Sequence, residues 1–150
     1  MGKLVAVAIV VGLAYLFLSN GQEWLGGNSG SSTGAISEEG QESESCIRAV
    51  ENANDSFADE LRQHSRPPID PDAWSATMSS VDGLIAEAES SCSCSTASCE
   101  KASEALSELQ SLVYDFDSLA SGSATGWSNP GTRQETIQRL LGDAQSLIDS

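Results

Sequence analysis

Apolar residues recur at alternating steps of three and four along four separate stretches of this chain. That spacing places them on one face of an α-helix, so each stretch predicts a helix that packs against its neighbours. No stretch alternates with a period of two residues over a useful length, which argues against a sheet. The four predicted core faces are Cys46, Ile47, Val50, Ala53, Phe57, Leu61 and His64; Trp74, Met78, Val81, Ile85 and Ala88; Cys99, Ala102, Ala105, Leu106, Leu109, Leu112, Val113, Phe116, Leu119 and Ala120; and Ile137, Leu140, Leu141, Ala144, Leu147 and Ile148.

Capping and helix-breaking residues separate these stretches. The segment SRPPIDP, residues 65–71, stops the first helix with two prolines and starts the second with an Asp-Pro N-cap. Gly122 ends the third helix, and Thr132 with Glu135 predicts a capping box for the fourth. Helices of about 18 to 22 residues with short connections predict an antiparallel four-helix bundle.

A longer helix is the alternative for the middle of the chain. The apolar rhythm continues without a phase break through Cys92, Ser95 and Cys99, so a rod over residues 72–120 could form a coiled coil. In that rod Cys92 and Cys99 would lie on one face about 10 Å apart, placed to link separate chains. Nine of the ten residues 90–99 are Ser, Thr or Cys, which are indifferent helix formers, so we favour a turn.

The amino terminus carries the most apolar segment. Residues 4–18, LVAVAIVVGLAYLFL, would span roughly 22 Å as a helix, short of the roughly 30 Å hydrocarbon core of a bilayer. Residues 1–25 are therefore a short membrane anchor or a signal peptide with a poor cleavage site before Gln22, and aromatic flanks favour the anchor. Lys3 precedes the run and no Lys or Arg follows it until Arg48, which predicts a cytoplasmic amino terminus and an extracytoplasmic remainder.

Residues 26–45, GGNSGSSTGAISEEGQESES, contain almost nothing that could pack in a core. As a flexible coil they would reach roughly 22 to 27 Å. The expected order is thus an anchor in residues 1–25, a Gly/Ser/Glu-rich linker in residues 26–45 and a helical domain in residues 46–150.

This arrangement predicts that the four cysteines lie close together. In an antiparallel bundle the start of the first helix, the end of the second and the start of the third meet at one end, where Cys46, Cys92, Cys94 and Cys99 would lie. Disulfides persist outside the cytoplasm, so two are expected. Spacing alone does not separate the three pairings; we favour Cys46 with Cys92 and Cys94 with Cys99. The C-x-C-x4-C pattern lacks the paired C-x2-C knuckles of zinc sites, so we expect neither a metal nor another cofactor.

Charge and composition narrow the function. Twenty-two Asp and Glu against seven Lys and Arg give a net charge of −15, which argues against nucleic acid as a partner. His64 is the only histidine, so a Ser/His/Asp or Cys/His site cannot be built without it, and we expect no catalytic residues and no enzyme. Trp127, in the loop of residues 122–131, is expected either to pack back onto the bundle or to serve as a partner contact.

The order of anchor, polar tether and exported helical domain resembles the plan of inner-membrane lysis spanins of phages. It is also similar to the plan of small membrane-anchored virion proteins and accessory subunits of envelope complexes. We therefore expect a membrane-anchored, non-enzymatic structural or adaptor protein whose acidic domain binds another membrane, envelope or virion protein. The alternative is a virion structural component or a lysis protein that forms homo-oligomers through helix faces.

Overall fold

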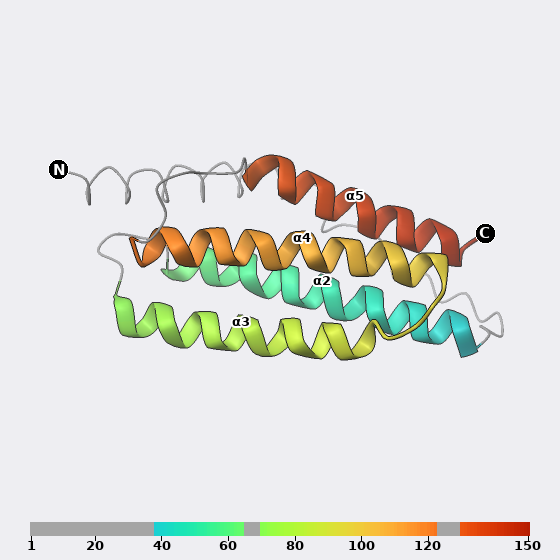
Figure 1. Cartoon of the computed structure of the whole chain (residues 1–150), viewed down its shortest axis with the longest axis horizontal. Coiled ribbons are helices and arrows are strands. Elements are labelled where there is room, and N and C mark those ends of the chain that lie inside the picture. The colour runs from blue at the N-terminus through green and yellow to red at the C-terminus, as the bar shows by residue number, and fades with distance from the viewer. Residues whose placement is uncertain (1–37, 65–69, 123–129) are drawn as a thin grey trace.

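The computed structural model describes residues 38–64, 70–122 and 130–150, and these ranges form four α-helices without a strand (Figure 1). The helices are α2 (Glu38–His64), α3 (Pro71–Ser91), α4 (Ala97–Ala120) and α5 (Pro130–Ile148). Each helix runs opposite to the one before it, as the colours along the chain in Figure 1 show. The predicted all-helical bundle of four antiparallel helices is confirmed for the described residues.

Helices α2 and α4 form the centre of the bundle. Each contacts the three other helices, whereas α3 and α5 do not contact each other within the described ranges. α4 packs most extensively against α5, and α2 against α3, while α3 and α4 meet over a smaller contact. Phe57 of α2 and Phe116 of α4 meet edge to face across the centre, with ring centroids 5.6 Å apart. Both rings are enclosed, and this arrangement is a favoured one for aromatic pairs.

The predicted apolar faces form this core, with exceptions in the last turns of helices. All five residues predicted for the second helix are buried. His64 instead lies partly exposed at the end of α2, with its Nε2 3.3 Å from Oε2 of Glu60. Leu147 is 46 % exposed near the end of α5. These two core predictions are wrong because a helical repeat that is covered in the middle of a bundle loses its neighbours at the last turn.

Two of the predicted helix ends are confirmed. Oδ1 of Asp70 accepts hydrogen bonds from the backbone N–H groups of Asp72 at 2.9 Å and Ala73 at 3.3 Å, so Asp70 caps α3. Gly122 has a φ of 73°, a left-handed conformation that glycine adopts without strain. Its N–H donates to the Leu119 carbonyl at 3.0 Å, which closes the end of α4.

The predicted capping box of the fourth helix is wrong. α5 begins at Pro130, so Thr132 lies inside the helix, and its carbonyl accepts the Thr136 hydroxyl at 2.8 Å. Glu135 is an exposed residue of the same helix. Proline is well suited to the first helical position because its φ is already helical, and here it starts the helix ahead of the Thr and Glu pair.

The first described helix begins earlier than predicted. α2 starts at Glu38, so residues 38–45 of the predicted linker are helical, and residues 26–37 lie outside the described residues. Glu38 and Glu39 stand in the first turn, where negative charge complements the helix dipole. Ser43 is buried and its Oγ donates to the Glu39 carbonyl at 2.9 Å. A polar segment is thus part of the bundle.

The helical rod over residues 72–120 is wrong. α3 ends at Ser91 and α4 begins at Ala97, and the two helices run in opposite directions (Figure 1). The Ser, Thr and Cys residues between them form the turn that their weak helix propensity predicts.

Residues 1–25, with the predicted anchor at 4–18, lie outside the described residues. Within 38–64, 70–122 and 130–150, none of the helices combines the length and apolar character needed to cross a bilayer.

Candidate functional site

All four cysteines meet at one end of the bundle and form two disulfides. Cys46 lies on α2, Cys92 follows the last turn of α3, Cys94 lies in the turn, and Cys99 lies in the first turn of α4. Cys46 is bonded to Cys92 with a Cα–Cα distance of 4.6 Å, and Cys94 to Cys99 with 5.9 Å. These are the two bonds that we predicted among the three possible pairings, and both lie within one chain.

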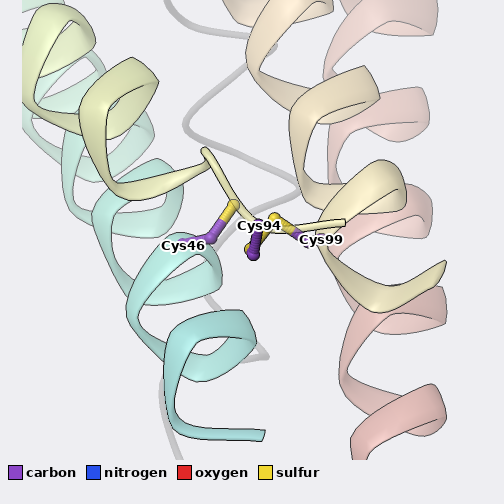
Figure 2. A group of neighbouring side chains, drawn as sticks. All are labelled: Cys46, Cys94 and Cys99. Carbon is purple, nitrogen blue, oxygen red and sulfur yellow. A yellow bond between two sulfur atoms is a disulfide. The ribbon is translucent and has the colours of Figure 1, made fainter. Parts of the chain in front are cut away.

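The two disulfides touch each other. The Sγ atoms of Cys46, Cys94 and Cys99 all lie within 4.8 Å of one another, and Figure 2 shows the Cys46 side chain of α2 pointing toward Cys94 and Cys99 at the α3–α4 turn. Cys46 and Cys99 are fully buried, while Cys92 and Cys94 are partly exposed. As disulfides, the sulfurs fix α2 to the α3–α4 turn; as thiols, they would offer several metal ligands in one place.

Hydroxyl groups position the turn beside the sulfurs. Oγ1 of Thr96 accepts the N–H of Cys99 at 3.1 Å and thereby caps α4. Thr96 Oγ1 also lies 2.6 Å from Oγ of Ser43. Because Ser43 donates its own hydroxyl proton to Glu39, the Thr96 hydroxyl donates in this bond. This cap was missed in the sequence, since many Ser and Thr residues around the turn offer the same signal.

Mass spectrometry of the non-reduced protein can check the pairing. We expect backbone cleavage beside Ser93 to separate a fragment that carries the Cys46 peptide from the loop closed by Cys94 and Cys99. In either other pairing Cys92 is bonded to Cys94 or Cys99, so the same cleavage would leave the fragments joined. Collisional fragmentation, which leaves disulfides intact, distinguishes the two results.

The sequence singled out two further residues, Trp127 and His64. Trp127 lies outside the described residues, so its role as a partner contact stays a prediction. His64 pairs with Glu60, as noted above. Asp115 and Asp117 flank Phe116 but diverge: Asp117 accepts the Trp74 indole N–H at 3.0 Å, and Asp115 lies 3.7 Å from Arg133 on α5.

A shallow groove between α3 and α4 is a second feature, and the sequence did not predict it. Two hydrogen bonds bridge the helices beside it, from Trp74 to Asp117 at 3.0 Å and from Gln110 to Glu89 at 2.6 Å. The groove has a volume of about 270 Å³. Tyr114, which is 71 % exposed, lies on its edge. The lining residues are Met78, Asp82, Ile85, Gln110, Val113, Tyr114 and Asp117. One signal in the sequence could have indicated this groove: Tyr114 is an aromatic residue that lies off the apolar face of the third predicted helix.

Positive charge on the described surface is neutralised locally. Arg48 pairs with Glu44 and Arg62 with Asp59, each within one helix. Every other described Lys or Arg also has a carboxylate partner: Lys101 with Glu104, Arg133 with Glu108 and Asp115, and Arg139 with Asp143. α3 carries acidic residues and no basic one. Negative charge therefore dominates the surface that an approaching molecule meets.

Two neighbouring carboxyl groups on α2 repel each other. Partial burial, followed by the charge of Asp55, raises the pKa of Glu51 above its ordinary value of 4.5. Partial burial, followed by the charge of Asp59, raises the pKa of Asp55. Ionisation of each group therefore lowers the free energy of unfolding. This destabilisation is present above the raised pKa and is absent well below the ordinary pKa, where the group is protonated in both the folded and the unfolded states.

Glu51→Gln is therefore expected to raise the free energy of unfolding by about 0.2 to 0.5 kcal/mol at neutral pH, the size of an exposed like-charge pair on a helix. The gain should vanish as the pH falls well below 4.5, where Glu51 of the wild type is protonated in both the folded and the unfolded states. Urea unfolding at both pH values measures this. Exposed Glu42→Gln on the same helix is the control, and an equal gain there would contradict the assignment.

Two arrangements thus emerge from the described residues: a sulfur cluster that joins α2 to the turn between α3 and α4, and an acidic groove beside an exposed tyrosine. No family model, curated protein or solved structure matches this chain.

Proposed function

We propose that this chain is a membrane-anchored, non-enzymatic structural or adaptor protein whose acidic helical domain, outside the membrane, binds a partner protein in the groove between α3 and α4. The observation that carries the proposal is Tyr114, an exposed aromatic side chain beside a groove with acidic residues and an apolar floor. Tyrosine is among the residues that most often dominate binding energy, because it offers a large contact area at little entropic cost.

The groove suits an amphipathic helix of the partner. Met78, Ile85 and Val113 supply an apolar floor, and Asp82 and Asp117 place carboxylates beside it. An amphipathic helix docks by laying its apolar face in such a groove while its flanks meet the rim. The complementary flanks would be rich in Lys and Arg, because no described basic residue of this chain lines the groove.

Charge also argues against other occupants. A second copy of this chain would bring the same net charge of −15 to the groove and be repelled. An anionic lipid surface would be repelled for the same reason. The favoured occupant is therefore a different protein with a basic helical segment.

Binding to synthetic helices tests this proposal. We expect the full chain to bind a fluorescent amphipathic peptide built of leucine and lysine, and not its counterpart in which glutamate replaces lysine. Tyr114→Ala should weaken binding by about tenfold or more, the size of the loss at a residue that dominates binding. Leu147→Ala removes the other large exposed apolar side chain among the residues that the structure describes, on α5, and should leave binding within about twofold. Equal binding by the two variants, or self-association of the chain through Tyr114, would overturn the proposal.

The membrane part of the proposal rests on residues 4–18, with Lys3 before them and the acidic domain after them. Val10→Arg places a charge in the middle of this run, at a cost of about 2.5 to 3.5 kcal/mol for insertion. We expect the wild type to stay with membranes during alkaline extraction and Val10→Arg to be released. Release of both proteins to the same extent would argue against an anchor.

A further inference from the structure

We propose that the four cysteines form a second kind of site: when both disulfides are reduced, Cys46, Cys92, Cys94 and Cys99 bind one zinc ion. Three of the sulfur atoms already lie within 4.8 Å of one another, and the fourth, that of Cys92, is bonded to Cys46 (Figure 2). Four thiolates around tetrahedral zinc, with Zn–S bonds of about 2.3 Å, stand about 3.8 Å apart. Once reduced, the two bonded pairs would have to separate to about this distance, and the Cys92 sulfur would have to join the three that already lie close together.

The surrounding protein holds these positions without the disulfides. Cys46 projects from α2 and Cys99 from α4, and these helices are joined across the core by Phe57 and Phe116. The turn between them is held by the hydroxyl contact of Ser43 with Thr96. A site assembled on helices that pack independently of it keeps its ligands together after reduction.

The local electrostatics favour thiolates at one of the ligands. Cys99 lies in the first turn of α4, where the N-terminal end of the helix dipole stabilises a negatively charged group such as a thiolate. Zinc binds thiolates and displaces their protons, so this position assists ligation.

Disulfide and zinc exclude each other. Reduction of each disulfide takes two electrons and two protons, supplied by a dithiol that becomes a disulfide or by a phosphine that takes oxygen from water. Four thiols result, and binding of one zinc ion forms four Zn–S bonds and releases four protons. Either chemistry joins α2 to the α3–α4 turn, so the groove between α3 and α4 keeps its framework in reducing and oxidising surroundings alike.

Cobalt serves as the spectroscopic probe for this site. The full chain, reduced with a phosphine and kept free of oxygen, should bind one Co²⁺ per chain with the charge-transfer and ligand-field bands of tetrahedral thiolate ligation. Zinc should displace the cobalt with a Kd of about 1 nM or tighter. Circular dichroism should show that the reduced chain is helical before and after metal is added. The oxidised chain should bind neither ion.

Matched variants decide the outcome. Cys94→Ser with Cys99→Ser leaves two thiols after reduction and should weaken zinc binding by more than about 100-fold. Loss of a residue that only hydrogen-bonds to a metal ligand already lowers metal affinity by up to about 100-fold, so loss of two ligands should lower it further. Ser93→Ala, in the same turn and exposed, should bind like the wild type. Zinc binding by the reduced wild type no tighter than by the double serine variant would overturn the proposal. So would a cobalt spectrum without tetrahedral thiolate bands, or a reduced chain that stays unfolded when zinc is added.

Discussion

Removal of the Cys46–Cys92 disulfide, by Cys46→Ala with Cys92→Ala, is expected to lower the free energy of unfolding by about 4 kcal/mol. The bond joins residues 46 positions apart, and closure of a loop of that length restricts the unfolded chain strongly. The Cys94–Cys99 bond closes a loop of separation five, for which the same relation gives about 2 kcal/mol. The longer loop should therefore contribute the larger part of the stabilisation from the two bonds.

Urea unfolding of the full chain in mild detergent, followed by circular dichroism, measures both values. Cys94→Ala with Cys99→Ala is the matched control, because it removes the same number of sulfurs from the same end of the bundle. Equal losses from the two double variants would contradict the account of the Cys46–Cys92 bond as the principal covalent link.

Phe116→Ala is expected to lower the free energy of unfolding by about 3 to 5 kcal/mol, because it opens a cavity where α2 and α4 meet. Phe116 is 1 % exposed and its ring packs on Phe57. Tyr114→Ala, two positions away on the same helix, should change the free energy of unfolding by no more than about 0.5 kcal/mol, since that side chain faces solvent.

A double-mutant cycle with Phe57→Ala isolates the ring contact. We expect a coupling of about 0.5 to 1.5 kcal/mol between Phe57 and Phe116, the range for aromatic pairs in this geometry. Similar losses for Phe116→Ala and Tyr114→Ala would show that the α4 face is assigned incorrectly. That result would also remove the basis for treating Tyr114 as a binding residue.

The core was predictable because the apolar spacing reports which face of a helix is covered. Trp74 and Ile85, for example, were predicted from spacing and are buried. The same spacing fails at His64 and Leu147, where it continues past the neighbouring helices. The pattern carries no information about where coverage by a neighbour stops.

The start of α2 was missed for a different reason. Residues 38–45 bury only Ser43, so their composition is that of a solvated segment whether they are helical or not. Ser43 joins this segment to the rest of the bundle through its contact with Thr96, which lies 53 positions away. Local composition cannot report a contact over that separation.

The two candidate sites also differ in whether the sequence predicts them. The meeting of the cysteines follows from the antiparallel order of the helices, which the turn residues and helix lengths predict. The groove depends instead on how closely α3 and α4 approach, which spacing along each helix does not determine. Only the position of Tyr114 off the core face hinted at it.

The central claim is that the groove between α3 and α4 binds a basic partner protein outside the membrane. Photo-cross-linking in the native membrane tests it most directly, with a photoreactive phenylalanine analogue in place of Tyr114 and, as the control, in place of Leu147. We predict one discrete cross-linked protein from position 114 and not from 147, joined through a segment rich in Lys and Arg. Once purified, that protein should bind the wild-type chain and lose affinity for Tyr114→Ala. Cross-links of equal yield from both positions, or to an acidic segment of a second copy of this chain, would contradict the claim.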